Sequence, residues 1–580
     1  MPGRTSSAST VAGSAAGLGI DAYSHVPSTP TPGAEHAIAD LQEAIGATVP
    51  DREAVVWRDR RVTWAELTER TRRFANGLLA EGVGGGVVHD PEAPGWVSPH
   101  DHIALLLTNG NEYLEAMVGA WKAGAAAINV NYRYTAEELA SLLADAHAVA
   151  VVYHARFAPV LDAALARTPS VHLLVVVDDG SGTEPVAGSV PYESLLDGAA
   201  AVRPDVPWTP DDRYVVYTGG TTGNPKGVLW RQGDFLHTAL GIREDLGQLV
   251  ERARRPGRPR ALPAPPLMHG AAHWNALSCL LAGGTVVIQD HPEHLDAADV
   301  LDTCQREAVG SLLVVGDAFA RPLLDEQRRH PRDLSALRAL MTGGAILSPA
   351  LKSELLEVLP GLRIVDILGS SETGRHGLAT ASADRDAEAG VFEPSDTTVV
   401  LDTTRTRELH PGEDEVGWLA QRGRVPLGYL GDPERTGETF PRIGGAVHAV
   451  AGDRARRRGD GAVELLGRDS VTINTGGEKV HAEEVEQALK SHPDVYDVLV
   501  VGRPSERWGS EVVAVVHLRA GLAPDALDGD ALRATAAERL ARYKLPKAFV
   551  GVDRVQRSAS GKPDYAWARE VASPPAPDGG

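Results

Sequence analysis

The stretch Tyr217-Thr-Gly-Gly-Thr-Thr-Gly-Asn-Pro-Lys-Gly-Val228 is the segment around which the rest of the chain can be interpreted. The apolar and aromatic run Arg213-Tyr-Val-Val-Tyr217 predicts a buried strand that leads into the glycines. Glycines allow the backbone that leaves such a strand to direct several N–H groups at one phosphate. The threonine hydroxyls add donors or cation ligands, and Lys226 adds a mobile positive charge. The stretch therefore predicts a phosphate-binding loop.

Two other interpretations of this loop are weaker. A Walker A loop needs Ser or Thr directly after its lysine, whereas Gly227 follows Lys226 and Pro225 precedes it. A flexible glycine loop without a ligand is the plainer alternative, and the order of the residues argues against it. The stretch instead resembles the phosphate loop of the adenylate-forming superfamily, which includes acyl-CoA synthetases, peptide-synthetase adenylation domains and luciferases. Gly219 stands where these relatives usually have Ser, which removes a hydroxyl donor and keeps the backbone cradle.

Length and composition limit the class of protein. The chain has 580 residues, enough for more than one domain, and its net charge of −21 argues against binding nucleic acid through a generally basic surface. Only two cysteines occur, which excludes a disulfide framework and fits a cytoplasmic location. No run of 18 apolar residues is present, so no membrane span is expected. Residues 1–33 and 572–580 are rich in small residues and proline, and we expect disordered tails there.

Strand-like and helix-like segments alternate before the glycine loop. Capping boxes at Thr63-Trp-Ala-Glu66 and Thr135-Ala-Glu-Glu138 each predict a helix, the first running to about Leu79. Strands are predicted by the apolar runs 102–107, 125–130, 148–153 and 171–177. Such alternation indicates parallel sheets covered by helices, hence an α/β fold. The polar segment 82–100 is longer than a usual connection and predicts an insertion or a lid.

His269 and His273 have the i, i+4 spacing of a helical zinc pair. Gly270 stands where the zinc-protease signature needs Glu, and the nearby sequence offers no third ligand, which argues against zinc. Pro265-Pro-Leu-Met-His269 resembles the superfamily's Pro-Leu-x-His segment beside the acyl pocket, whose histidine helps to gate the carboxylate. His269 is therefore a candidate catalytic residue by resemblance, and a core histidine is the alternative.

The residues after His269 indicate the kind of acid that the chain accepts. Amino-acid-activating relatives place an Asp here for the substrate ammonium, and no Asp occurs between Pro265 and Leu280. We therefore expect an apolar wall that suits a hydrophobic acyl group. The candidate lining residues are Ala271, Ala272, Trp274 and Gly316.

Two later segments resemble nucleotide motifs of the superfamily. Thr342-Gly-Gly-Ala345 resembles its Ser-Gly-Gly-Ala turn, which packs on the adenine. Ile367-Leu-Gly-Ser-Ser-Glu-Thr-Gly374 resembles its Tyr-Gly-x-Thr-Glu motif, although Leu368 replaces the tyrosine. The retained Glu372 suits Mg²⁺, because this hard cation prefers oxygen ligands. The resemblance implies a catalytic magnesium site on Glu372 and Thr221.

Further motifs imply the ribose site and the hinge. By resemblance, Asp453 accepts both ribose hydroxyls and Arg468 reaches the nucleotide, with a surface turn and a surface arginine as the plain alternatives. Ser470 stands at the hinge position, where relatives often have Asp or Lys. The implied ATP-binding residues are Thr218, Gly219, Gly220, Thr221, Thr222, Gly223, Lys226, Gly343, Gly344, Ala345, Ser370, Ser371, Asp453 and Arg468.

The C-terminal part resembles the small domain of the same superfamily. Ile473-Asn-Thr-Gly-Gly-Glu-Lys479 resembles the loop that lines the pantetheine tunnel, which makes Gly476, Gly477 and Lys479 candidate CoA contacts. Ser558-Ala-Ser-Gly-Lys562 resembles the ending whose lysine is catalytic. The implied organisation is a large N-terminal domain of helix-covered sheets over 34–469 and a small, mobile α+β domain over 470–571.

The resemblance covers about residues 35–570 and looks most like bacterial acyl-CoA synthetases of fatty-acid and steroid side-chain breakdown. It implies two half-reactions that use ATP, Mg²⁺ and CoA. A carboxylate attacks the α-phosphorus to give acyl-AMP and pyrophosphate, and the CoA thiol then takes the acyl group after the small domain has rotated. Transfer to a carrier protein, an aryl-acid substrate and a non-catalytic ligand-binding relative stay open as alternatives. The identity of the acid is open as well, and so is the oligomeric state, for which a homodimer is one option.

Overall fold

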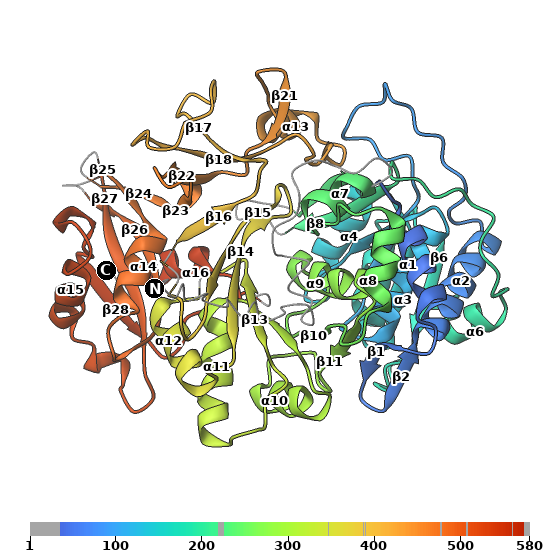
Figure 1. Cartoon of the computed structure of the whole chain (residues 1–580), viewed down its shortest axis with the longest axis horizontal. Coiled ribbons are helices and arrows are strands. Elements are labelled where there is room, and N and C mark those ends of the chain that lie inside the picture. The colour runs from blue at the N-terminus through green and yellow to red at the C-terminus, as the bar shows by residue number, and fades with distance from the viewer. Residues whose placement is uncertain are drawn as a thin grey trace, which may run out of the picture.

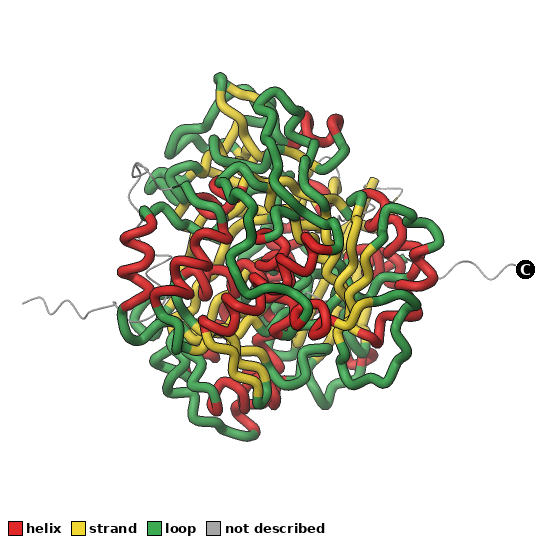
Figure 2. The backbone as a smooth tube through the Cα atoms, turned by 90° about the vertical axis from the view of Figure 1, so that its right-hand side faces the viewer, coloured by secondary structure: helices red, strands yellow, loops and turns green. Residues whose placement is uncertain are grey.

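The computed structural model describes residues 35–218, 225–345, 347–386, 388, 390–475, 478–505, 509–558 and 561–573. Figure 1 shows a large body, which ends with β23 (Val463–Arg468), and a smaller C-terminal part, here called the lid, which begins with β24 (Thr472–Thr475). Figure 2 shows the strands of the body lying between groups of helices. The fold is α/β with a large N-terminal part and a smaller C-terminal one, as the sequence predicts. No helix among these described residues is long and apolar enough to cross a membrane.

A five-stranded sheet forms the first layer of the body, and all of its strand pairs are parallel. Its strands in spatial order are β4 (Ala126–Asn129), β3 (His102–Leu106), β5 (Ala148–His154), β6 (Leu173–Val177) and β7 (Val190–Pro191). The helices of this region are α2 (Trp64–Ala80), α3 (Asn111–Lys122), α4 (Ala136–Asp145), α5 (Ala158–Leu165) and α6 (Tyr192–Asp197). The predicted strands and both capping boxes are confirmed here, with ends that differ by one or two residues.

A larger, fifteen-stranded sheet continues through the rest of the body. Its parallel part runs in the order β1 (Glu53–Trp57), β11 (Thr285–Ile288), β10 (Arg260–Pro263), β12 (Ser311–Val314), β13 (Ala339–Gly343) and β14 (Arg363–Ser370). The antiparallel strands are β2 (Arg60–Thr63), β15 (Gly374–Ala381), β16 (Val391–Pro394), β17 (Thr398–Leu401), β18 (Val416–Arg422), β20 (Arg442–Ile443), β21 (Ala446–Ala449), β22 (Asp453–Arg457) and β23. The parallel part ends at β14, where the candidate nucleotide motifs lie.

The remaining helices of the body flank these sheets. They are α1 (Ile38–Thr48), α7 (Gln232–Thr238), α8 (Leu246–Arg254), α9 (Gly270–Leu281), α10 (Ala297–Arg306), α11 (Gly316–Arg329), α12 (Pro349–Val358) and α13 (Pro433–Thr439). A third, three-stranded antiparallel sheet consists of β8 (Arg213–Thr218), β9 (Lys226–Arg231) and β19 (Gly428–Tyr429). The glycine loop thus joins the two strands of a hairpin.

The lid is an α+β unit with its own hydrophobic core. A three-stranded sheet of β26 (Val495–Ser505), β27 (Gly509–Leu518) and β28 (Ala548–Val552) carries the helices α14 (Ala482–Leu489), α15 (Gly529–Ala537) and α16 (Tyr565–Ala572). A two-stranded ladder of β24 and β25 (Glu478–His481) precedes them. A 3₁₀ turn over Asp469–Val471, which contains the predicted hinge residue Ser470, connects the lid to β23.

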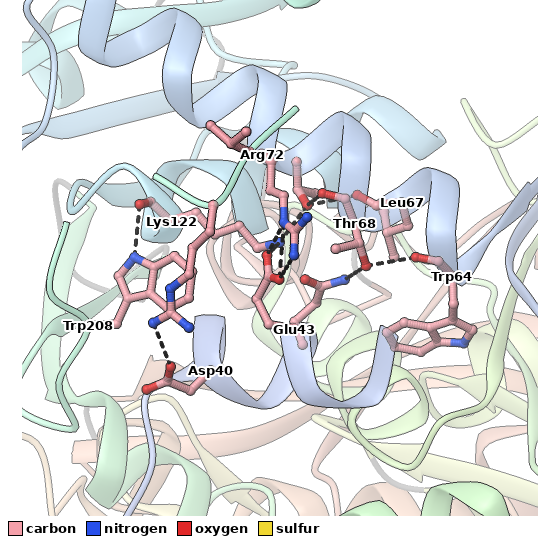
Figure 3. A network of polar contacts seen from close by, with 12 residues as sticks. Asp40, Glu43, Trp64, Leu67, Thr68, Arg72, Lys122 and Trp208 are labelled. Atoms are coloured by element: carbon pink, nitrogen blue, oxygen red, sulfur yellow. Dashed lines mark hydrogen bonds and ion pairs between the residues drawn. The ribbon is translucent and has the colours of Figure 1, made fainter. Parts of the chain in front are cut away.

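A buried ionic network joins α1, α2 and α3 at the N-terminal end of the body (Figure 3). Lys122 is fully buried, and its ammonium group forms ion pairs with Glu43 and donates to Thr71 Oγ1 at 2.9 Å. Arg72 from α2 donates to the same carboxylate. Burial lowers the pKa of Lys122 to about 8, although the charge of Glu43 opposes this shift. Buried charges of this kind are tolerated because they are paired.

The long segment 82–100 lies against the nucleotide side of the body. It is the blue loop at the upper right of Figure 1. The Trp96 carbonyl accepts a hydrogen bond from Gly431 N at 2.9 Å, and Gly95 is so close to Leu427 O that a Cβ would come within 2.3 Å of it. The segment therefore packs beside β19, which carries Tyr429.

Candidate active site

The glycine loop connects two strand residues that pair with each other, Thr218 of β8 and Lys226 of β9. Five residues predicted to bind phosphate lie outside the described residues, namely Gly219, Gly220, Thr221, Thr222 and Gly223. Lys226 lies at the start of β9, with Nζ 5.0 Å from the centre of the Tyr429 ring. The pairing of β19 with β9 brings that ring next to the loop. A cleft of about 220 Å³ opens here between Lys226, Asp145 and Arg435.

Glu372 lies in the turn between β14 and β15. Its Oε1 accepts a hydrogen bond from the Tyr429 hydroxyl at 3.1 Å, and Oε2 has no hydrogen-bond partner within the described residues. The turn is closed by Ser370, whose N–H donates to Thr373 Oγ1 at 3.1 Å, and by Ser371, whose carbonyl accepts from Trp230 Nε1 at 2.9 Å. These contacts fix the turn and one carboxylate oxygen, and leave the other oxygen without a partner among the described residues.

Asp453 and Arg468 face each other across β22 and β23, with Nε 3.4 Å from Oδ1. Burial raises the pKa of Asp453, the charge of Glu372 adds to this shift, and the charge of Arg468 opposes it. The structure thus brings the two residues predicted for the ribose side into contact with each other and into the electrostatic range of Glu372.

Lys562 from the lid lies beside Gly344 of the body. A Cβ placed on Gly344, which has φ of +78°, would lie 3.6 Å from Lys562 Cε. Burial lowers the pKa of Lys562, the charge of Arg468 lowers it further, and the charge of Glu372 opposes both. Lys562 nevertheless keeps a surface that is accessible to solvent.

His269 is next to this lysine, at the start of α9. Burial lowers its pKa to about 3, and the charge of Lys562 contributes to the shift, so the ring is neutral at physiological pH. Its Nε2 has no hydrogen-bond partner among the described residues. His273 has both ring nitrogens engaged, by the Tyr214 hydroxyl and by the Leu267 carbonyl. Because both ring nitrogens of His273 are hydrogen-bonded, neither is available to join His269 as a second zinc ligand.

The residues predicted to line the acyl pocket differ in exposure. Ala271 is exposed, and Trp274 is half-buried, with Nε1 donating to the Tyr214 hydroxyl at 2.6 Å. Ala272 is fully buried in the main hydrophobic core, and its role as a lining residue stays a prediction. One step along a helix turns a side chain by about 100°, which separates these two alanines. Gly316 is buried, and its N–H donates to Thr342 Oγ1 at 3.0 Å.

The adenine motifs occupy neighbouring strand ends. Gly343 ends β13, Gly344 and Ala345 follow it, and a Cβ on Gly270 would lie 3.5 Å from Ser371 Oγ. Leu368, which replaces the family's tyrosine, points away from these residues into a small apolar cluster. The adenine-facing role of that tyrosine is therefore not taken over by the leucine side chain.

The candidate CoA residues lie in the ladder at the start of the lid. Lys479 is an exposed residue of β25 that pairs with Asn474. Gly476 and Gly477 at the tip lie outside the described residues. Lys479 thus has no described contact with the residues around Lys562.

Sequence reasoning missed Tyr429. Its position in the short run Leu427-Gly-Tyr-Leu430 has no local feature that sets it apart from a core aromatic residue. Its role becomes visible only through the pairing of β19 with β9. In the sequence, the one sign of a functional tyrosine is that Tyr429 follows a glycine, and this sign is weak.

Comparison with known proteins agrees with this geometry. Residues 41–430 match the family model of AMP-binding enzymes, and residues 484–562 match that of the AMP-binding enzyme C-terminal domain. Medium-chain acyl-CoA ligase Mig of Mycobacterium avium is 47% identical over 542 residues, which are 92% of this chain and 97% of that protein. The 3-oxocholest-4-en-26-oate–CoA ligase of Rhodococcus rhodochrous is 39% identical over 92% of this chain and 95% of its own length.

A solved structure shows the same fold. The anthranilate CoA ligase AuaEII in complex with anthranoyl-AMP superposes with a TM-score of 0.79 at 22% identity, over 93% of this chain and 97% of that chain. Both family models and the two relatives cover the body and the lid together. The chain therefore belongs to the AMP-binding enzyme family and is an acyl-CoA synthetase of the adenylate-forming superfamily.

Proposed function

We propose that this synthetase acts on a hydrophobic carboxylic acid, either of medium-to-long chain or with a fused-ring skeleton. The observation that carries the proposal is the segment after His269, where Ala271 is exposed and no Asp is present to bind a substrate ammonium, together with the position of Lys562 beside Gly344. The product of the first half-reaction is acyl-AMP with pyrophosphate, and the second half-reaction yields acyl-CoA and AMP.

Positioning and charge neutralisation account for the first half-reaction. The substrate carboxylate attacks the α-phosphorus of ATP in line. Lys562 supplies positive charge beside Gly344, between the carboxylate and the α-phosphate oxygens, as negative charge builds up there. Asp453 accepts hydrogen bonds from the ribose hydroxyls, and Arg468 orients that carboxylate across the strand pair. His269, being neutral, lines the path of the acid without attracting it as a cation.

The surroundings of Glu372 fit a magnesium ion. One carboxylate oxygen has no partner among the described residues, while the other accepts a hydrogen bond from the Tyr429 hydroxyl. Mg²⁺ prefers such oxygen ligands, and when bound it supplies neutralisation of the phosphate charge. Glu372 would hold it, and we propose Thr221, outside the described residues, as a second ligand.

The second half-reaction requires Lys562 to leave, because the CoA thiol needs access to the acyl carbonyl. We propose domain boundaries at 34–469 and 470–571, with rotation of the lid about Ser470 in the 3₁₀ turn. Gly476, Gly477 and Lys479 are the proposed contacts of the pantetheine arm after that rotation. The position of Lys562 beside Gly344 supports a lid orientation that suits the first half-reaction.

The proposed acid class is supported by the wall and by the relatives. The names of the two relatives refer to medium-chain acids and to a steroid acid. Each CH₂ group buried contributes roughly 0.8 kcal/mol, so kcat/KM should rise steeply with chain length until the pocket is full. Trp274, anchored by Tyr214, is the candidate floor of that pocket.

A chain-length series tests the proposal. ATP-dependent pyrophosphate release and acyl-CoA formation are measured for acids from acetate to palmitate and for a steroid side-chain acid. We expect the maximum of kcat/KM at medium or long chains, and a shift to longer acids in Trp274→Ala. A maximum at acetate or propionate would show that the pocket is short and the proposed acid class wrong.

We also propose a cytoplasmic location, supported by two buried cysteines that are both free thiols. A homodimer is a further proposal, and the molar mass in solution decides it. Neither proposal affects the roles assigned to the residues above.

A further inference from the structure

The first turn of α11 is the place where the lid's Lys562 turn meets the body. Gly561 directly precedes Lys562 and has φ of +76°. A Cβ on this glycine would come 3.0 Å from the Phe319 ring and 3.3 Å from the Val315 carbonyl oxygen. The backbone next to the catalytic lysine therefore rests directly on the body.

Asp317, in the same turn of α11, has one oxygen bound to the body and one bound to the lid. Its Oδ1 accepts a hydrogen bond from Ser348 N at 2.7 Å, and its Oδ2 lies 3.0 Å from Lys490 Nζ. The side chains of Asp317 and Lys490 are only 9% and 10% exposed. Solvent and salt screen such a pair much less than a surface pair. The Asp317–Lys490 contact is thus a buried ion pair that crosses the body–lid interface.

The contact continues through the lid to the turn that carries the catalytic lysine. Lys490 Nζ lies 3.4 Å from Asp497 Oδ1, and Asp497 accepts two hydrogen bonds of 2.7 Å from Arg557. Arg557 Nη1 also donates to the Gly561 carbonyl at 3.2 Å. A continuous series of charged contacts therefore runs from Asp317 of the body to the residue before Lys562.

The arrangement stabilises the observed lid position and limits the cost of breaking the contact. Burial alone would lower the pKa of Lys490, but the charges of Asp317 and Asp497 outweigh it and raise the pKa. Asp497 belongs to the lid and stays with Lys490 when the lid moves, whereas Asp317 stays with the body. Breaking a buried pair is costly chiefly when a charge is left uncompensated, and Asp497 limits that cost. The pair thus stabilises the docked position without making it permanent.

We propose that Asp317 and Lys490 are positioning residues for the adenylation half-reaction, because their contact holds the lid where Lys562 faces the acid and ATP. The inference rests on the proposed function for its division into two half-reactions. Weakening the contact should slow the first half-reaction, which needs the docked lid, and spare the second, which needs it released. This selectivity separates a positioning role from a general loss of stability.

Two isosteric or nearly isosteric variants test the proposal from opposite sides of the interface. Lys490→Met removes the lid's charge, and Asp317→Asn removes the body's charge while keeping an acceptor for Ser348 N. Single-turnover formation of decanoyl-AMP without CoA is expected to fall about tenfold or more in each, and the double variant should be no worse than either single variant. Conversion of supplied decanoyl-AMP and CoA to the thioester should stay within about twofold of the unchanged protein. Lys490→Arg should restore most of the adenylation rate.

Arg519 provides the matched control. Its Nη2 lies 3.8 Å from Glu354 Oε1, which is also a contact from lid to body, but these side chains are 39% and 23% exposed. Exposed pairs contribute little, so Arg519→Met should leave both half-reactions within about twofold of the unchanged protein. Comparable slowing of adenylation in this control would reject a specific role for the buried pair.

Amide hydrogen exchange gives a readout that needs no substrate. Residues 315–319 should exchange faster in Lys490→Met and Asp317→Asn than in the unchanged protein, and no faster in Arg519→Met. The inference is overturned if exchange and adenylation are unchanged in both variants, or if both half-reactions slow equally. Failure of the unchanged protein to form decanoyl-AMP rejects a medium-chain acid as the substrate instead, and the exchange experiment still decides the role of the pair.

Discussion

The Tyr429 hydroxyl donates a hydrogen bond to Glu372 Oε1 at 3.1 Å, while the ring of the same tyrosine lies 5.0 Å from Lys226 Nζ. A single side chain of β19 thus contacts the carboxylate that fits Mg²⁺ and the lysine that ends the glycine loop. The two contacts use different parts of Tyr429, so two substitutions separate their effects.

Replacing Tyr429 with Phe removes the hydrogen bond to Glu372 and keeps the ring beside Lys226. A hydrogen bond to a charged group contributes about 1.5–3 kcal/mol, so acyl-AMP formation should slow by roughly tenfold or more. The Mg²⁺ concentration for half-maximal rate should rise, because the carboxylate is less well fixed. A magnesium titration measures this, with Tyr429→Leu as the variant that also loses the ring. An unchanged titration in the Phe variant would remove Tyr429 from the metal site.

Lys562→Ala should separate the two half-reactions completely. Acyl-AMP formation is expected to be lost, because no other charge of the described residues is placed against Gly344. The conversion of supplied acyl-AMP and CoA to thioester is expected to continue, since that step requires the lysine to be absent. Pyrophosphate release and thioester formation are assayed separately. Equal loss of both activities would contradict the assigned role.

Glu43, Lys122 and Arg72 form one buried ionic network, and substitutions at Glu43 and at Lys122 should lower the free energy of unfolding by different amounts. Glu43→Gln leaves the buried Lys122 charge without a carboxylate, and we expect the free energy of unfolding to fall by about 3–5 kcal/mol. Lys122→Met leaves Glu43 paired with Arg72 and should cost less. Urea unfolding at neutral pH measures both. A larger loss in Lys122→Met than in Glu43→Gln would show that packing, rather than charge pairing, controls this site.

The lid should be less stable at higher pH because of Glu486. This carboxyl group is buried in the lid, where Oε1 accepts from Val500 N at 2.9 Å, and burial raises its pKa to about 8. Between the pKa of the unfolded chain, near 4.5, and about 8, the folded lid binds a proton that the unfolded lid has lost. The free energy of unfolding therefore falls as pH rises through this window, on the order of a few kcal/mol.

Glu486→Gln cannot titrate and should flatten this dependence. Unfolding of the lid, followed at pH values across the window, measures the slope. Glu538→Gln, an exposed position in the same lid, is the control and should keep the slope of the unchanged protein. A slope that survives in Glu486→Gln would assign the pH dependence to other groups.

Features whose partners lie within a few residues were predicted well. The capping boxes at Thr63 and Thr135 have donors and acceptors three residues apart, so the sequence contains the whole interaction. The resemblance, rather than local pattern, also assigned Asp453 and Arg468 to one site, and the two side chains are in contact, while their nucleotide-binding role stays a prediction.

Features that depend on tertiary pairing were not predictable from the residues. Tyr429 meets Glu372 because β19 pairs with β9, and nothing near Tyr429 in the sequence specifies that pairing. Ala271 is exposed and Ala272 is buried because successive side chains of α9 point in different directions. The position of a residue in a motif does not specify that direction. The Asp317–Lys490 contact also depends on lid placement, and neither residue belongs to a motif.

The parallel pairing of β1 with β11 has a consequence for synthesis of the chain. Thr285 Oγ1 donates to the Glu53 carbonyl at 2.7 Å, although the two residues are 232 positions apart. At a ribosomal rate of about 5–20 residues per second, the apolar strand Val55–Val56 waits roughly ten to fifty seconds for its neighbour to emerge. During this interval its edge is open to incorrect pairing. The nascent chain should therefore depend on chaperones most strongly between the synthesis of β1 and that of β11.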